Sequence, residues 1–283
     1  MSPRNNQDRV NTPVPDTSPP PPAVEQQDNT FSFVVPTEFV DLPSEGDFYS
    51  EGHPLHGRTS IEMKHMTAKE EDILTSESLL RKGIAIERLL QSLIVDKSVK
   101  LDDLLVGDKN ALIVGARITG YGSDYHTNVS CPSCRVTQET EFDLLELESS
   151  KCTLPEGVER SIEDTFFVEL PHSGFSVEVR LLTGHDERQY LSGSTRKRKK
   201  KLRESTTTDL LRLLILSVDG RDDVESINNL LEVLPVRDSV HIRKVYEQIS
   251  PDVDLNQDFD CESCGYEGSI GVPLNADFFW PGR

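Results

Sequence analysis

Four cysteines form two Cys-x-x-Cys pairs whose spacing suits a metal ion. The first pair is Cys131 and Cys134, and the second is Cys261 and Cys264. A gap of two residues lets both thiolates of a tight turn reach one ion, and four sulfurs complete the tetrahedral shell of structural Zn²⁺. Such a saturated site leaves no open position for water, so the predicted zinc is structural and not catalytic.

Each pair is flanked by strand-like residues, at 125–129 and 136–142 and again at 259–260 and 266–272. These flanks predict two β-hairpins with cysteines at their tips, the two knuckles of a zinc ribbon. The pairs are separated by residues 135–260, whereas ribbon spacings usually run to a few tens. Closing so long a loop costs about 4 kcal/mol plus a constant. Structural zinc contributes on the order of 10 kcal/mol or more, so a split ribbon around a folded insert is favoured.

Three other interpretations of these cysteines stay open. Disulfides are disfavoured because there are five cysteines and no recognisable signal peptide, which indicates a reducing compartment. A redox motif requires a helix N-terminus, whereas both pairs lie between predicted strands. The cysteines could also be ordinary small core residues. Cys152 lies outside both knuckles and is expected to be a buried side chain.

Composition narrows the function classes. The net charge of −19 and a pI near 4.8 argue against a general nucleic-acid binder, and no apolar run is long enough to span a membrane.

The basic block Arg196–Lys201 lacks interleaved aromatic residues and is typical of a solvated face. His53 and His56 have ligand-like spacing but no third ligand nearby. No phosphate loop, dinucleotide fingerprint, zinc-protease motif or nucleophile elbow occurs, so no enzyme is predicted.

Patterning predicts an α+β fold in which a split four-cysteine zinc ribbon, formed by two distant knuckles, joins helical segments and a mostly helical insert lobe. Four regions are expected. They are a disordered Pro-rich leader over 1–30, an irregular docking arm over 31–58, a strand, helix and ribbon region over 59–145 and 255–283, and an insert over 146–254 with a β-hairpin and a helical bundle.

Within these regions the periodicity predicts individual elements. A strand over 60–66 precedes a capping box at Thr67–Glu70, which begins a helix. Further predicted helices cover 77–95, a segment from about Asp108 to Gly120 and Gly122, and, in the insert, 183–202, 206–218, 224–234 and a last one capped by Asp238. A hairpin is predicted from 166–170 and 175–181.

Several blocks of the chain resemble a baseplate protein family of T-even-type phages with contractile tails. The resemblance covers roughly residues 31–283. It is carried by Leu42–Tyr49, Gly52–Gly57, Met66–Leu74, Leu104–Asn110, Cys131–Cys134 and Pro273–Pro281.

The resemblance implies a non-enzymatic virion tail protein, a structural subunit of the baseplate hub whose partners are other tail proteins. It implies a location in the virion tail, and in the host cytoplasm during assembly. Two alternatives remain, a hub assembly factor absent from the mature virion and a zinc-ribbon nucleic-acid-associated protein. The aromatic run Phe278–Trp280 is expected either to cap its own core or to anchor in a neighbour.

Overall fold

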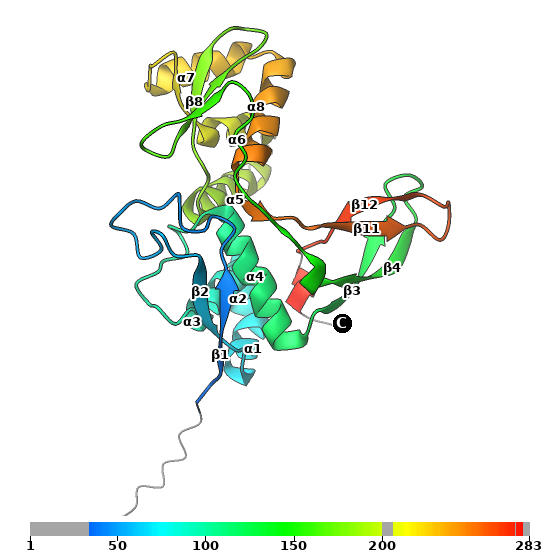
Figure 1. Ribbon diagram of the computed structural model, residues 1–283. Helices are drawn as coiled ribbons and strands as arrows, with labels where there is room; N and C mark the ends of the chain where they lie inside the picture. The colour runs from blue at the N-terminus through cyan, green and yellow to red at the C-terminus, as the bar shows by residue number, and fades with distance from the viewer. Residues whose placement is uncertain (1–33, 200–205, 275, 280–283) are drawn as a thin grey trace, which may run out of the picture. The chain divides into compact units, whose positions relative to one another are not determined.

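The computed structural model describes residues 34–199, 206–274 and 276–279, and for 194–199 and 276–277 it describes the backbone alone. The predicted leader therefore lies outside the described residues, as do the side chains of Arg196–Lys201 and the residue Trp280. The chain divides into two units, Met1–Val34 and Val35–Arg283, and the second contains all the elements below. It mixes helices with small sheets, and every strand pair is antiparallel, in agreement with the predicted mixture of helices and strands (Figure 1).

A strand pair and four helices form the first part of this unit. Glu70 accepts a hydrogen bond from the Thr67 N–H at 3.1 Å, which confirms the predicted capping box. The predicted helix over 77–95 is wrong in one respect, because Gly83 has φ = 70° and divides it in two. The elements are β1 (Thr37–Asp41), β2 (Ser60–Lys64), α1 (Ala68–Thr75), α2 (Glu77–Lys82), α3 (Ala85–Leu93) and α4 (Val106–Tyr121).

The arm that follows β1 is fixed to α4 by a buried carboxylate. Asp108, in the first turn of α4, is fully buried. It accepts hydrogen bonds from the N–H and hydroxyl of Ser44, at 3.0 and 2.6 Å, and from the hydroxyl of Tyr49, at 2.6 Å. The Tyr49 hydroxyl in turn accepts one from the Leu105 N–H at 3.1 Å. This part of the arm is therefore built into the protein's own core.

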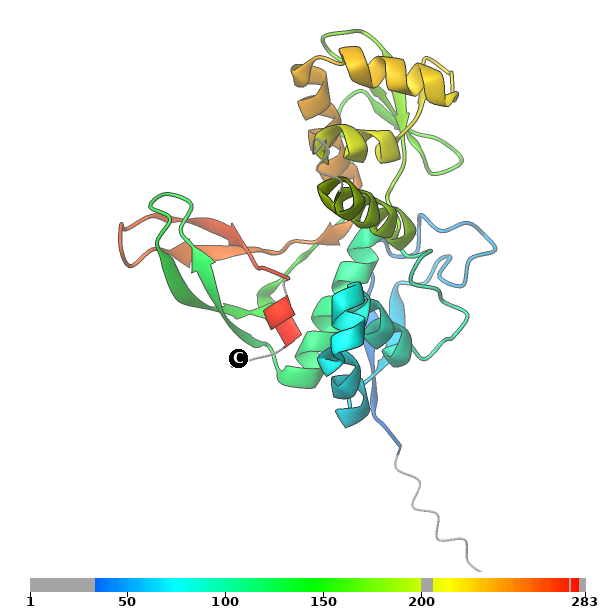
Figure 2. The same cartoon turned by 180° about the vertical axis from the view of Figure 1, so that it is seen from behind.

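The four strands of the predicted ribbon come from two distant stretches of chain and form two hairpins that lie side by side in both views (Figures 1 and 2). Arg117 of α4 holds the base of the first hairpin by donating to the carbonyls of Gly122 and Asp124, at 2.6 and 3.0 Å. The strands are β3 (Asp124–Ser130) with β4 (Thr137–Asp143), and β11 (Asn256–Asp260) with β12 (Glu267–Gly271).

The C-terminal aromatic residues close the space beside α4 and β3. Phe278 and Phe279, in the short 3-10 helix η2 (Ala276–Phe279), are 1 % and 0 % exposed. The Phe278 ring meets Tyr125 edge-on at 5.0 Å between centroids. Of the two expectations for this run, the described residues follow the first, because both phenylalanines cap the protein's own core.

The insert leaves and re-enters the fold at one place. β5 (Ser149–Ser150) pairs with β10 (Asp252–Val253), so the chain's exit and return lie together. Gly107 of α4 allows this, since a Cβ there would lie 2.0 Å from the Pro251 carbonyl oxygen. The returning strand is therefore pressed directly against the helix.

Within its described residues, the insert contains a four-stranded sheet and four helices, and Figure 1 shows their arrangement. The predicted hairpin is confirmed as β7–β8, and the sheet gains an outer strand on each side, in the order β6-β7-β8-β9. The predicted helix over 206–218 is too long, because it ends at Leu214 and the next four residues form a strand that pairs with β8. The elements are β6 (Val158–Arg160), β7 (Phe166–Glu169), β8 (Ser176–Val179), α5 (Gly184–Lys199), α6 (Thr206–Leu214), β9 (Ile215–Val218), α7 (Val224–Val233) and α8 (Val236–Ile249).

Asp238 does not cap α8 as predicted. The helix begins at Val236 after Pro235, and Asp238 is fully buried within its first turn. Its carboxylate accepts hydrogen bonds from the backbone N–H groups of His172 and Ser173, at 3.0 and 2.9 Å. Asp238 therefore stabilises the β7–β8 turn by a tertiary contact that the local sequence does not reveal.

An ion pair between the buried Asp186 and the partly exposed Arg180 stabilises the start of α5. Asp186 is 3 % exposed and accepts two hydrogen bonds from Arg180, at 2.9 and 2.7 Å, and two from Thr183, both at 2.9 Å. Burial alone would raise the pKa of Asp186, but these donors outweigh burial and hold the pKa below its ordinary value. The ionised form is therefore favoured by folding.

Replacing Asp186 by asparagine is expected to lower the free energy of unfolding by about 2–3 kcal/mol near pH 7. Because the folded-state pKa is depressed, this stabilisation is complete above the unfolded-state pKa of about 4 and is lost as the pH falls through the folded-state value. Urea unfolding from about pH 7 down to about pH 3 should show the difference from wild type shrinking. A constant difference would contradict this, and the exposed Asp222→Asn serves as the matched control.

Candidate metal centre

The two cysteine turns are built in the same way. In the first, the Cys131 N–H donates to the Val136 carbonyl at 2.9 Å, and the Arg135 N–H donates back to the Cys131 carbonyl at 2.9 Å. In the second turn, the equivalent hydrogen bonds link Cys261 with Tyr266 at 2.8 Å and Gly265 with Cys261 at 2.9 Å. Each turn therefore presents its two thiols from the same rigid scaffold.

This scaffold requires a left-handed residue directly after the second cysteine of each pair. Gly265 supplies it with φ = 68°, at no steric cost. Arg135 occupies the same place with φ = 62°, a conformation that costs a non-glycine residue about 1 kcal/mol or more. The first cysteine turn therefore has the same backbone geometry as the second, although Arg135 is strained in this conformation.

The four thiols meet at the tips of the two hairpins. The Sγ atoms of Cys131, Cys134, Cys261 and Cys264 all lie within 4.8 Å of one another. Two pairs across the hairpins, 131 with 264 and 134 with 261, are 3.8 and 3.7 Å apart. A tetrahedral ion with metal–sulfur bonds of about 2.3 Å requires sulfurs about 3.8 Å apart. The donor set therefore fits zinc, and all five cysteines of the chain are free thiols.

The thiols influence one another's ionisation. Burial favours the neutral form of Cys131, but the N–H groups of Cys134 and Ser133 donate to its sulfur and lower its pKa to about 7. At Cys134 the Val136 N–H favours the thiolate, yet burial and the neighbouring cysteines outweigh it and raise the pKa to about 11. The pKa values of Cys131 and Cys134 thus shift in opposite directions, as expected for neighbouring thiols in which a second negative charge is disfavoured.

Two glutamines hold the hairpins together, Gln138 beside the thiols and Gln257 at the opposite end of the strands. The Gln138 amide donates to the Asp260 carbonyl at 2.9 Å and accepts from the Glu262 N–H at 3.1 Å. At the other end of the ribbon, Gln257 donates to the Asp143 carbonyl. Sequence reasoning missed both, because a glutamine on an exposed strand gives no sign of a partner more than a hundred residues away.

The other sequence candidates lie apart from this cluster. Cys152 is half-buried, burial raises its pKa, and it does not belong to the cluster. The His53 ring stacks on Tyr49 with centroids 4.4 Å apart, and His56 Nδ1 lies 2.5 Å from the Tyr49 carbonyl oxygen. Within the described ranges, the four cysteines form the single group of histidine, cysteine and acidic side chains placed to share an ion.

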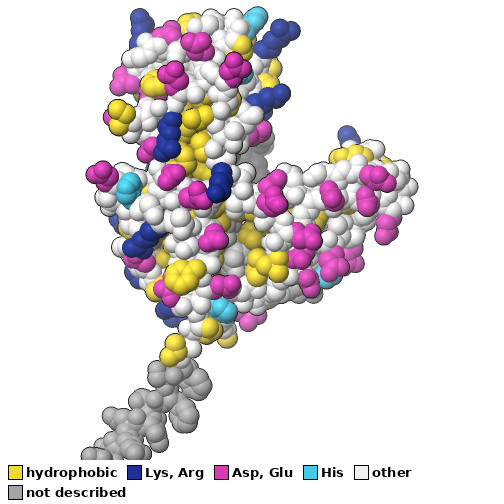
Figure 3. Space-filling view, viewed as in Figure 1, with side chains coloured by type: hydrophobic (Ala, Val, Ile, Leu, Met, Phe, Trp, Pro, Cys, Tyr) yellow, Lys and Arg dark blue, Asp and Glu magenta, His cyan; other side chains and the backbone are white. Residues whose placement is uncertain are grey.

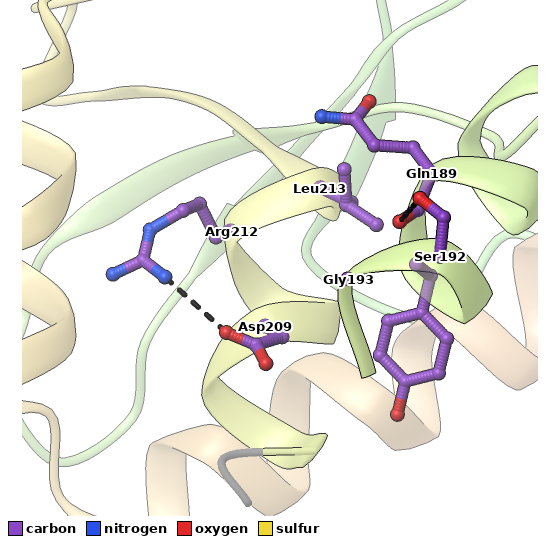
Figure 4. Close-up of a pocket in the computed structure, with 7 residues that line it drawn as sticks. Gln189, Ser192, Gly193, Asp209, Arg212 and Leu213 are labelled. Atoms are coloured by element: carbon purple, nitrogen blue, oxygen red, sulfur yellow. Dashed lines mark hydrogen bonds and ion pairs between the residues drawn. The ribbon is translucent and has the colours of Figure 1, made fainter. Parts of the chain in front are cut away.

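A hollow of about 330 Å³ between α5 and α6 offers no comparable chemistry (Figure 4). Arg212 lines it and is engaged by Asp209 at 3.4 Å and by Asn228 at 2.9 Å. The Ser192 hydroxyl donates to the Gln189 carbonyl at 3.0 Å. Among the described residues that line the hollow, the charged pair Asp209 and Arg212 is bonded internally, and no histidine or cysteine is present to form a nucleophile and base pair.

Comparison with known proteins agrees with the sequence resemblance. No match was found among curated proteins or among solved structures. The family described as T4 bacteriophage base plate protein matches residues 36–280, which is most of the chain and includes both cysteine pairs. The chain therefore belongs to the T4 bacteriophage base plate protein family.

Proposed function

We propose that this protein is a non-enzymatic structural subunit of the baseplate hub, in which one zinc ion bound by Cys131, Cys134, Cys261 and Cys264 staples two distant parts of the chain. The observation that carries the proposal is the meeting of these four sulfurs, two from each end of the insert, in a chain of baseplate family. Zinc would make the region before the insert and the region after it one rigid part.

Several segments of the chain are fastened to α4 or to β3, the strand that follows it, as a structural subunit of fixed shape requires. Asp108 fastens the arm to α4, and Arg117 fastens the first hairpin to the same helix. The buried Phe278 packs on Tyr125 of β3. A family of structural proteins agrees with a non-enzymatic role. Within the described part of the chain, no helix is both long and apolar enough to cross a membrane.

The surface disfavours a nucleic-acid function. Acidic side chains are spread over the face shown in Figure 3, including the ribbon. Together with the net charge of −19, they would repel a phosphate backbone. The partners we infer are therefore proteins of the tail.

Purified particles test this assignment. Mass spectrometry is expected to find the protein in mature virions, and it should sediment with baseplates in about 1 M salt, where exposed charge interactions are screened. If the protein is present in assembly intermediates but absent from mature virions, it is an assembly factor and not a hub subunit. Salt-sensitive binding to DNA without baseplate association would overturn the structural role.

A further inference from the structure

The outer edge of β1 carries backbone groups without a strand partner in the described structure. β1 pairs with β2 alone, in a two-stranded sheet. The Pro36 carbonyl accepts from the His65 N–H at 2.9 Å, and the Leu42 N–H donates to the Thr59 carbonyl at 2.8 Å. Because antiparallel strands alternate in the direction of their backbone groups, the odd-numbered residues between these two bonds point away from β2. Those residues are Thr37, Phe39 and Asp41.

A groove of about 310 Å³ runs beside this free edge. β1 lines one side of it, and four residues of the segment 144–149 line the other, namely Leu144, Leu145, Leu147 and Ser149. Phe39 and Leu145, one on each side, are 66 % and 69 % exposed, and Figure 3 shows hydrophobic side chains among acidic ones on this face. The face of α4 that lines the groove is mostly apolar: Ala111, Val114, Gly115 and Ile118 lie there together with Thr119.

This combination of a free strand edge and an apolar floor fits an added β-strand. The backbone of an incoming segment would bond the outward groups of β1, and alternate side chains would lie on the apolar face of α4. Exposed edges of this kind are usually shortened, charged or covered, because they pair readily with other chains. The outer edge of β1 is therefore suited to pair with a strand from another chain.

Charge specifies the partner. The charged side chains among the described groove residues are Glu38 and Asp41, both exposed and both acidic. The His65 ring lies 3.7 Å from Glu38 and opposes its charge only when the imidazole is protonated. A second copy of this chain would bring its own net charge of −19 against this rim. Lysine or arginine side chains on the incoming strand would complement it.

We propose that the groove between β1 and residues 144–149 receives an extended segment of a neighbouring baseplate protein, with apolar residues alternating with lysine or arginine. The inference rests on the proposed baseplate function and names its docking surface. It does not depend on the metal, because β1 and the groove lie outside the cysteine cluster.

A proline substitution tests the hydrogen-bonding edge. In the full-length protein, Phe39→Pro removes one outward N–H while leaving the bonds to β2, and proline is tolerated where a strand's N–H faces outward. We expect Phe39→Pro to reduce incorporation into purified baseplates by about tenfold or more, and Phe39→Val to remain close to wild type. Thr37→Pro, at the first strand position, should repeat the loss. Zinc content and thermal unfolding of the free protein should match wild type in all three.

Normal incorporation of folded Phe39→Pro and Thr37→Pro would overturn the proposal. If a Cys261→Ser variant fails to enter baseplates but both proline variants enter normally, the zinc-stapled subunit is supported. The docking site at β1 alone is then refuted. A photo-crosslinking amino acid at position 39 identifies the occupant in assembled baseplates. A cross-link to a basic, alternating segment of another tail protein supports the proposal. A cross-link to a second copy or to residues 1–33 of the same chain would refute the assigned partner.

Discussion

Replacing Cys261 by serine is expected to abolish zinc binding and to lower the free energy of unfolding by about 5 kcal/mol or more, since structural zinc contributes on that scale. Cys261 is buried, and its sulfur lies 3.7 Å from that of Cys134 on the opposite hairpin. Three thiols and a serine hydroxyl are a poor zinc site. Without the ion, the hairpins would be linked at their tips mainly through Gln138.

Metal analysis and thermal unfolding measure this effect on the purified chain. Wild type should carry one zinc per chain, and a strong chelator should destabilise it to the level of the Cys261→Ser variant. The chelator should have no further effect on the variant, because both remove the same interaction.

Cys152→Ser is the matched control, as it makes the same chemical change at a half-buried cysteine outside the cluster. It should keep its zinc. Retention of a full zinc equivalent by Cys261→Ser would contradict the proposed four-thiolate site, and so would equal loss from the control.

Baseplates connect this measurement to function. If zinc makes the two halves one part, Cys134→Ser and Cys261→Ser should lose the metal and baseplate incorporation together. Incorporation of either variant without metal would show that the staple is not needed for docking.

The cysteine cluster was predictable because its signal is local. Each Cys-x-x-Cys turn is specified by a few neighbouring residues, and strand-like flanks identify the hairpins that carry it. Two features that support the cluster, the left-handed backbone of the first turn and the hydrogen bonds between the hairpins, were not predictable. Arg135 gives no local indication of a left-handed backbone, and Gln138 finds its partners only when the second hairpin arrives.

Errors in the predicted elements have the same origin. Residues 215–218 continue a helical run of leucines, but pairing with β8 overrides that preference because Ile215 and Val218 fill buried strand positions. Asp238 has the residue type and place of a helix cap, yet it is fully buried and binds the β7–β8 turn. In both cases a tertiary contact decided between two local structures that the sequence permits.

Asp108 is the extreme case, since an aspartate in the first turn of a helix is ordinarily a solvated complement to the helix dipole. Here it lies at 0 % exposure and bonds the arm through Ser44 and Tyr49. Burial raises the pKa of Asp108, and the hydrogen bonds from Ser44 and Tyr49 only partly oppose it.

Asp108→Ala is expected to lower the free energy of unfolding by about 3–5 kcal/mol, because it leaves the Ser44 N–H, the Ser44 hydroxyl and the Tyr49 hydroxyl buried without their acceptor. Chemical unfolding followed by circular dichroism measures the loss. Asp103→Ala, at an exposed position five residues earlier, is the control and should change stability by less than about 0.5 kcal/mol. A similar loss of stability in Asp108→Ala and Asp103→Ala would show that Asp108 has no special role in holding the arm.

The pH dependence of this loss distinguishes Asp108 from Asp186. The unfolded chain releases the Asp108 proton near pH 4, whereas the folded protein keeps it to higher pH, so raising the pH through that interval favours unfolding. The cost of Asp108→Ala should therefore be greatest in acid and shrink as the pH rises, opposite to Asp186→Asn. A double-mutant cycle with Tyr49→Phe should give a coupling of about 1 kcal/mol or more, because the hydroxyl and the carboxylate are bonded directly. Additive losses, or a cost of Asp108→Ala that grows with pH, would show that the buried carboxylate does not hold the arm to α4.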